Sequence, residues 1–183
     1  DYWALGHVHT REVLHERPWV VFPGNIQGRH IRETGPKGAT LLTVVDGRID
    51  SAEHRVLDVA RWARCRLDAS ELSSGDDVVD GVREQLEALA SDADGRPLAV
   101  RVEVTGMSDV HTLLSHDADR WRAALRATAS DVGEVWIEKV RFATEPRIDV
   151  LELAERDDAI GQIARALSPA VLDAQSGDDD PRV

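Results

Sequence analysis

Two histidines near the amino end, His7 and His9, are the residues of this sequence best suited to metal chemistry. A neutral imidazole nitrogen is a common ligand of divalent metal ions. The pair follows Tyr2–Leu5, an apolar run that is expected to form a buried strand, through Gly6, whose backbone freedom permits a sharp exit from a strand. Residues two apart in an extended backbone project to one side. The spacing therefore predicts two imidazoles at one metal site, although surface histidine pairs are common and the motif alone is weak.

A glycine-rich loop follows the next apolar run, Trp19–Phe22, which is expected to be a buried strand. Asn25, Gln27 and Arg29 of this loop are the candidates for contact with a substrate. The loop also carries a set of positive or titratable side chains, which are Arg29, His30, Arg32 and Lys37. Two interpretations of this positive face stay open, which are contact with backbone phosphates and a simple solvated loop.

These two segments together resemble a known enzyme family. The resemblance is carried by Ala4–His9 (ALGHVH), Pro23–His30 (PGNIQGRH) and Arg32–Gly38 (RETGPKG). They are similar to the last motif block of calcineurin-like metallophosphoesterases, in the form found in SbcD-type DNA repair exonucleases of the YhaO-like bacterial branch. The motif match covers residues 2 to 38, and a looser likeness extends to about residue 145.

The resemblance implies hydrolysis of phosphodiester bonds in DNA at a site with two divalent metal ions, typically Mn²⁺. It implies His7 as a ligand of one ion and His9 as a ligand of the other, with no catalytic residue independent of the metal ligands. It also implies that the loop Asn25–Arg29 lies near these histidines. The family takes its remaining ligands from four earlier motifs, D-x-H, G-D-x-x-D, G-N-H-D/E and an isolated histidine, which this sequence lacks. The chain is therefore interpreted as the carboxy-terminal part of such an enzyme, inactive alone because its site is incomplete.

The expected fold class is α/β (α+β) in three parts. Residues 1–56 are expected to supply the last strands of a metallophosphoesterase β-sandwich. They include a hairpin in which Asp46-Gly47 joins the strands Ala39–Val45 and Arg48–Val56. The first of these strands has few charges, so it is expected to be central or covered.

Residues 57–144 alternate strictly between strand and helix patterns. Strands are predicted at Arg61–Leu67, Leu98–Val104 and Val135–Phe142, and helices at 77–91 and 118–129. This order resembles the capping domain that follows the phosphoesterase domain in SbcD-type nucleases. Arg64 and Arg66 share one face of the first strand. Two interpretations are open, which are contact with nucleic acid and a solvated face balanced by carboxylates, and the pattern favours the second.

Composition limits the location and the partners of the chain. Its net charge is −12, and residues 1–56 are neutral, with seven basic and seven acidic residues. A polyanionic substrate is therefore compatible with the histidine-bearing part and unfavourable at the acidic tail. The single cysteine, Cys65, excludes an internal disulfide framework and agrees with a reducing cytoplasm, where it is expected in the core. No apolar run reaches the ~20 residues that span a bilayer, so no membrane association is expected.

Residues 145–183 are predicted to form one short amphipathic helix, ended by Pro169, and a disordered acidic tail over 174–183. The apolar side of the helix is expected to comprise Ile160, Ile163, Ala164 and Leu167. The expected partners are DNA, an SbcC-like ATPase and a second copy of the chain. Two alternatives remain, a scaffold module that only docks the ATPase and a phosphoesterase for another class of phosphoester.

Overall fold

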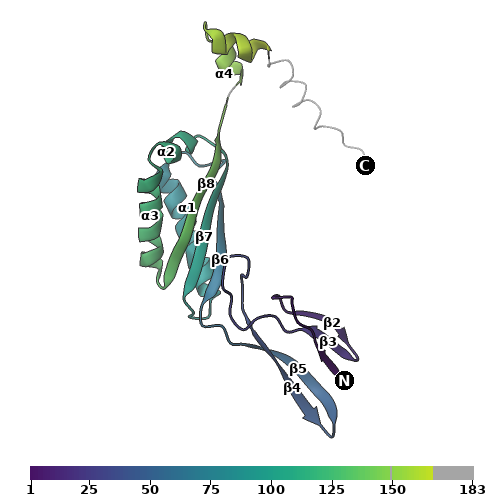
Figure 1. Ribbon diagram of the computed structural model, residues 1–183. Helices are drawn as coiled ribbons and strands as arrows, with labels where there is room; N and C mark the ends of the chain where they lie inside the picture. Colours follow the sequence, from purple (N-terminus) through teal and green to yellow (C-terminus); the bar gives the residue numbers. More distant parts are fainter. Residues whose placement is uncertain (149, 167–183) are drawn as a thin grey trace. The chain divides into compact units, whose positions relative to one another are not determined.

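The computed structural model describes residues 1–148 and 150–166. The chain divides after Glu145 into two units, and the second is described over residues 146–148 and 150–166. The described residues combine helices and strands, which confirms the α/β class (Figure 1). Every helix among them is too short or too polar to cross a bilayer.

The amino-terminal strands form a three-stranded sheet in the order β1-β3-β2. Strand β1 (Tyr2–Ala4) runs parallel to β3 (Trp19–Phe22), and β2 (Glu12–Glu16) runs antiparallel to β3 on its other side. The central position of β3 explains why Val21 is fully buried, as its apolar pattern predicted. The expectation that the first strand is buried was wrong, because β1 is an edge strand and Trp3 is 60% exposed.

The predicted hairpin is confirmed as β4 (Gly38–Val45) and β5 (Arg48–Val56), which pair antiparallel (Figure 1). Asp46 and Gly47 both adopt positive φ angles, 49° and 73°, which suits the right-handed twist of the strands that they join. The expectation that the first strand is central or covered was wrong within the described residues. Strand β4 pairs with β5 alone in a two-stranded sheet, and Leu41, Val44 and Val45 are exposed.

The third sheet has the order β6-β7-β8, formed by β6 (Arg61–Asp68), β7 (Leu98–Ser108) and β8 (Val135–Pro146). Strands β6 and β7 are parallel. The amide of Leu98 donates to the carbonyl of Glu134, and further along the strands Arg101 pairs with Glu138. The two partners are separated by nearly the same number of residues in both pairs, so β7 and β8 are also parallel. The expected alternation of strands and helices is therefore present as a parallel sheet.

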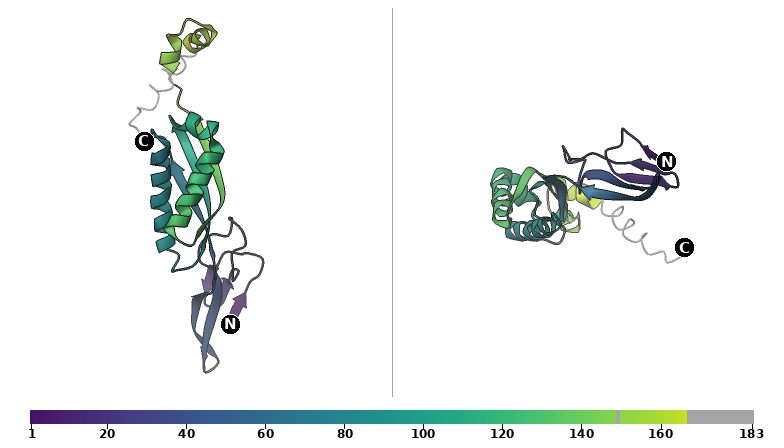
Figure 2. Two further views of the ribbon diagram at one scale, coloured as in Figure 1. Left: turned by 90° about the vertical axis from the view of Figure 1, so that its left-hand side faces the viewer. Right: turned by 90° about the horizontal axis from the view of Figure 1, so that it is seen from below.

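The helices of this layer are α1 (Gly75–Ser91), the short α2 (His111–His116) and α3 (Ala118–Val132). Both predicted long helices are confirmed. Helices α1 and α3 lie side by side over one face of the sheet (Figures 1 and 2), as expected for two successive right-handed crossovers between neighbouring parallel strands.

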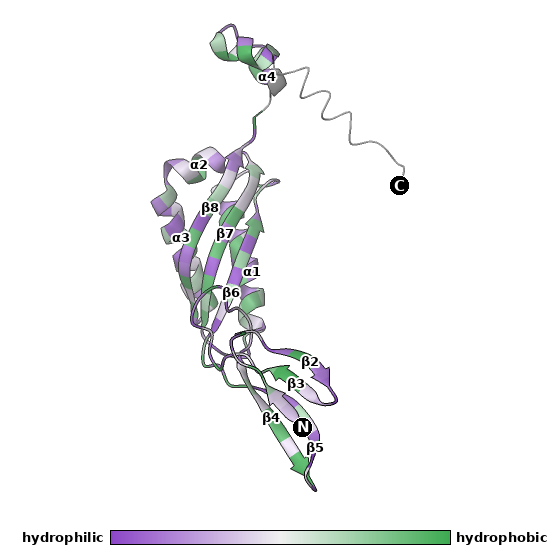
Figure 3. Ribbon diagram, turned by 45° about the vertical axis from the view of Figure 1, so that its right-hand side comes forward, coloured by the Kyte–Doolittle hydropathy of each residue, from purple (hydrophilic) through white to green (hydrophobic). Residues whose placement is uncertain are grey.

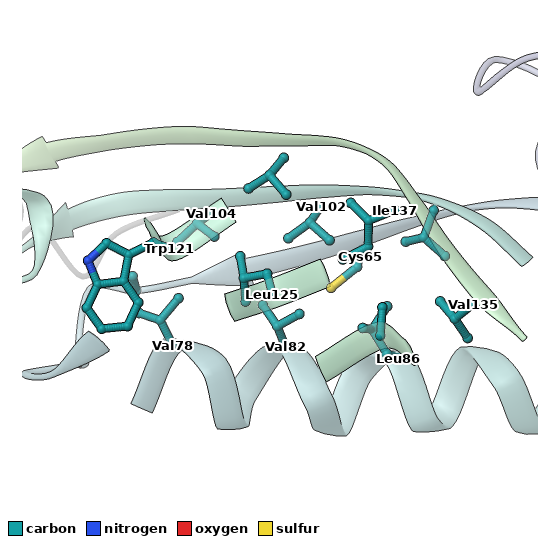
Figure 4. Packing of buried hydrophobic residues seen from close by; sticks show 14 of the residues in the cluster. Cys65, Val78, Val82, Leu86, Val102, Val104, Trp121, Leu125, Val135 and Ile137 are labelled. Atoms are coloured by element: carbon teal, nitrogen blue, oxygen red, sulfur yellow. The ribbon is translucent and has the colours of Figure 1, made fainter. Parts of the chain in front are cut away.

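The core of the molecule lies between these helices and the sheet (Figure 4). Helix α1 begins with a capping box, in which Ser74 Oγ accepts from the amide of Asp77 and the Asp77 carboxylate accepts from the amide of Ser74. It then presents apolar residues at helical spacing to the valines that alternate along β7. The buried side chains of α1, β6 and β7 include Val78, Val82, Leu86, Cys65, Val100, Val102 and Val104.

The opposite face of the sheet carries several ion pairs, and bands of hydrophilic residues cross the strands (Figure 3). Glu103 lies within 3.7 Å of the guanidinium groups of Arg64 and Arg141 and within 3.4 Å of that of Arg66. Arg101 makes two hydrogen bonds of 3.0 Å to Glu138. The carboxylates that the solvated-face interpretation requires are therefore in place beside the arginines.

The second unit contains α4 (Val150–Ala154) and a further helical segment over residues 159–166. The guanidinium of Arg165 donates to the carbonyl of Ala154 at 2.6 Å, which ties the two helical segments together. Ala164 is buried, whereas Ile160 and Ile163 are exposed. The predictions for Leu167, Pro169 and the acidic tail fall outside the described residues.

Candidate functional site

His7 and His9 lie on the loop that leaves β1, and both are exposed. The last sheet contact before them is the amide of Leu5, which donates to the carbonyl of Val21. The carbonyl of His9 then accepts from the amide of Asn25 at 3.2 Å, so the loop after β1 and the loop after β3 lie side by side. This is the arrangement expected for the two motif segments. The metal-ligand role of both histidines remains a prediction.

The backbone at His7 differs from the expected one. His7 has a φ of 81°, in the left-handed region, whereas the φ of Gly6 is not positive. The two histidines are therefore not two positions of one extended strand, and the alternation of a strand does not orient them. A left-handed backbone costs an ordinary residue about 1–2 kcal/mol. Such strain persists where the surrounding structure fixes it, and its position at an imidazole favours a functional site at His7.

Glu33 is the centre of the polar network beneath His9. Its side chain is 5% exposed, and its Oε1 lies 2.5 Å from Nδ1 of His9. Its Oε2 accepts from the amide of Arg29 at 2.8 Å and from Nδ2 of Asn25 at 3.0 Å. The Arg29 amide, followed by the contact with His9, lowers the pKa of Glu33 to about 2, so the group is a carboxylate at neutral pH.

Sequence reasoning missed Glu33. Its signal in the sequence is slight but real, because Glu33 is the sole carboxylate between Arg17 and Asp46. A lone acidic residue in a loop that otherwise carries basic side chains has donors within reach on several sides. The spacing of 24 residues between His9 and Glu33, however, does not predict a contact between their side chains.

The candidate substrate contacts occupy different positions in this loop. Asn25 Nδ2 donates to Glu33 and to the carbonyl of Gln27. Gln27 Nε2 donates to the carbonyl of Ala60 at 2.7 Å, and its Oε1 accepts from the amide of Val59 at 2.9 Å. Both ends of the Gln27 amide are thus used inside the protein. The Arg29 side chain is 68% exposed and is the one of the three best placed to reach a ligand.

The loop is attached to β6 and to the segment before it. The indole of Trp62 donates to the carbonyl of Gly28, and the amide of Lys37 donates to the buried carboxylate of Asp58, both at 3.1 Å. The expectation that Lys37 belongs to the positive face of the loop was wrong, because this residue is buried at the attachment point. The exposed basic residues of the loop are Arg29, His30 and Arg32.

A hollow of about 360 Å³ lies beside this attachment. Its wall is mostly apolar and includes Pro36, Trp62, Ala63, Leu89 and Leu98. Neither His7, His9 nor Glu33 lines it. This hollow is therefore separate from the candidate metal site, which lies on the exposed loops.

The described residues fit a divalent metal only as part of a ligand set. His9 presents an exposed imidazole whose Nδ1 is already engaged by Glu33, so Nε2 is the nitrogen left for a ligand role. In the described part of the chain, no group of three or more histidine, cysteine, aspartate or glutamate side chains is placed to share an ion. Further ligands would have to come from other residues.

Two comparisons with known proteins found sequences similar to parts of this chain. Residues 62–145, from β6 to the end of β8, match the family model for the middle domain of the metallophosphoesterase YhaO. The chain is also 40% identical over 107 residues to the uncharacterized metallophosphoesterase YhaO of Bacillus subtilis (strain 168). That alignment covers 58% of this chain and 26% of the relative, so the chain spans about a quarter of the length of the curated relative that it matches. Both matches support kinship with metallophosphoesterases, enzymes that hydrolyse phosphoesters with divalent metal ions.

Proposed function

We propose that this chain is the carboxy-terminal part of an SbcD-type exonuclease that hydrolyses DNA phosphodiester bonds with two divalent metal ions. In this proposal His7 binds one ion, His9 binds the other, and residues outside this chain supply the remaining ligands. The observation that carries the proposal is the buried Glu33 carboxylate, which holds the exposed His9 imidazole by its Nδ1. The kinship with metallophosphoesterases supports a hydrolase as the parent protein.

When bound, the two ions would activate a water molecule and stabilise the charge on the phosphoryl oxygens. The residues of this chain have simpler roles. His9 offers Nε2 as a ligand, and Glu33 holds its ring. Arg29 and Arg32 are exposed on the adjoining loop, where a guanidinium can contact the phosphates that flank the scissile bond. Asn25 and Gln27 support the loop that carries Arg29.

The choice of DNA as substrate rests on charge and on the form of the motifs. Residues 1–56 carry no net charge, although the whole chain carries −12, so the face with the histidines does not repel a polyanion as the rest would. Mn²⁺ is the proposed metal because it accepts both imidazole nitrogen and carboxylate oxygen. The cytoplasm is the proposed location, in agreement with the single buried thiol of Cys65.

A docking role for an SbcC-like ATPase is the second candidate function. The helical segment 159–166 exposes Ile160 and Ile163, which supports a contact surface for a partner. This role is compatible with catalysis in the parent protein. Capture of the ATPase by the intact protein but not by one that lacks residues 155–183 is the expected result. Equal capture by both proteins excludes the docking role.

The substrate class is tested with the longer natural protein that contains this chain. Mn²⁺-dependent hydrolysis is measured on linear duplex DNA and on a small aryl phosphodiester. We expect DNA to be hydrolysed with much the higher kcat/KM, because only a polymer reaches the exposed arginines of the loop while bound at the metals. Hydrolysis of the small diester alone would replace the exonuclease with the alternative phosphoesterase.

A further inference from the structure

The geometry points to Glu33 as the positioning residue for His9. It holds the proton of the imidazole on Nδ1, so that the lone pair of Nε2 is free for a metal ion. The metal part of this inference rests on the proposed function, whereas the tautomer does not. Glu33 would act through His9 and would touch neither the ion nor the substrate.

The tautomer follows from which groups can donate. The Arg29 amide and the Asn25 amide group can only donate to a carboxylate, and both donate to Glu33 Oε2. Glu33 is therefore an acceptor, and the shortest contact of its Oε1 is the one with His9 Nδ1 at 2.5 Å, since the Arg29 guanidinium lies 4.0 Å away. A neutral imidazole carries a single N–H, so a proton on Nδ1 leaves Nε2 as a free acceptor.

The carboxylate is held rigidly enough to impose this choice. The amide of Glu33 donates to the carbonyl of His30 at 2.8 Å, which closes a tight turn beneath the side chain. Gly28 passes so close that a Cβ there would meet the Glu33 carbonyl at 2.7 Å. The Gly28 carbonyl is itself bonded to the Trp62 indole. The backbone that carries Glu33 is thus tied through Gly28 to Trp62 of β6, and the side chain is held by its own contacts with His9, Asn25 and Arg29.

His30 does not share this role. Its Nε2 lies 3.5 Å from Glu33 Oε1, farther than the Nδ1 of His9, and its Nδ1 accepts from the amide of Arg32 at 3.3 Å. Two histidines of these loops, His9 and His30, have described contacts. Of these two, only His9 combines a short contact from Nδ1 to Glu33 with an Nε2 that no described contact uses. Carboxylate partners of this kind fix the tautomer and orientation of metal-binding histidines in many metalloproteins.

The tautomer is measured on the 183-residue chain with ¹⁵N-labelled histidine, by long-range ¹H–¹⁵N correlation at a pH where the imidazoles are neutral. We expect His9 to show a protonated Nδ1 and an unprotonated Nε2. His116, an exposed residue of α2, serves as the control and should show the reverse form that free histidine favours. In Glu33→Gln the side-chain amide can donate, so the His9 pattern should be lost. Protonation of His9 at Nε2 in the wild-type chain overturns the inference without any variant.

A second measurement separates this inference from the proposed function. Mn²⁺ affinity is determined by calorimetry for the longer natural protein and for its Glu33→Gln variant. We expect the variant to bind about 10–100-fold more weakly, as for other outer carboxylate partners of metal ligands. Equal affinity of both proteins overturns the positioning role and leaves the proposed function standing. A wild-type protein that binds no Mn²⁺, with Nδ1 of His9 protonated, overturns the proposed function and leaves the tautomer assigned.

Discussion

Trp62 is bonded to the candidate site loop through both its side chain and its backbone: its indole donates to the carbonyl of Gly28 at 3.1 Å, and its carbonyl accepts from the amide of Gly35 at 3.1 Å. Gly28 and Gly35 bracket the segment that contains Glu33. The first strand of the parallel sheet therefore supports the loop on which the His9 contact depends.

Trp62→Phe tests this support, because it keeps an aromatic ring and removes the N–H. The Gly28 carbonyl would lose one of its two donors and keep Nε2 of Gln27, so the free energy of unfolding should fall by about 1 kcal/mol in urea titrations. Trp136→Phe is the matched control, since Trp136 lies on β8 of the same sheet and is 63% exposed. A loss of equal size in both variants would contradict the role of the Trp62 indole.

Gln27 and Arg29 should behave in opposite ways. Gln27→Ala removes the bonds to Ala60 and Val59, so it should cost about 1 kcal/mol or more of stability. Arg29→Ala removes an exposed side chain and should leave stability within about 0.5 kcal/mol. In the longer protein, Arg29→Ala should weaken DNA binding and reduce the slope of log affinity against log salt by about 1. An unchanged salt slope would remove Arg29 from the DNA contacts.

The pH dependence of stability should reveal Glu33. Its pKa is lowered from 4.5 to about 2 on folding, so its ionised form stabilises the fold above pH 4.5. That contribution is lost as the pH falls from 4.5 towards about 2. The wild-type chain should therefore exceed Glu33→Gln in stability at pH 6, and the difference should shrink through this window. A difference that stays constant from pH 6 to pH 2 would mean that the carboxylate is not held as described.

Replacing His7 with glycine should preserve or raise the stability of the chain and lower its affinity for metal. Its φ of 81° suits glycine, so His7→Gly should relieve strain in the folded state. Because glycine also gives the unfolded chain more conformational freedom, the free energy of unfolding should equal that of the wild type or exceed it by up to about 1 kcal/mol. The same variant should lose Mn²⁺ affinity in the longer protein, because a ligand is gone. Clear destabilisation by His7→Gly would show that the imidazole makes contacts that hold the loop.

The sequence predicted the elements whose pattern is local. The apolar spacing along α1, the alternation from Leu98 to Val104 and the Asp46-Gly47 turn each follow from neighbouring residues, and each is confirmed. Burial across the sheet surface was harder to predict. Strand β4 has the composition of a covered strand, but coverage depends on what packs against it, and in the described residues that face is open.

The candidate site was likewise predicted only in part from the sequence. The proximity of the loops that carry His9 and Asn25 was predicted from motif segments. The contact between His9 and Glu33 was not, because it depends on a loop geometry set by turns and by the attachment to Trp62. The backbone at His7 also escaped prediction, since Gly6 is the residue whose type suits a positive φ and His7 is the residue that adopts it.

The most direct measurement is Mn²⁺-dependent hydrolysis of linear duplex DNA by four proteins: the 183-residue chain, the longer natural protein, and the His9→Ala and His116→Ala variants of the latter. We expect no hydrolysis by the 183-residue chain, because its described residues hold no cluster of three metal-binding side chains. We expect hydrolysis by the longer protein, abolished by His9→Ala and unchanged by His116→Ala. Near-normal activity of His9→Ala, or robust activity of the 183-residue chain, would contradict the assignment of an incomplete two-metal site to His7 and His9.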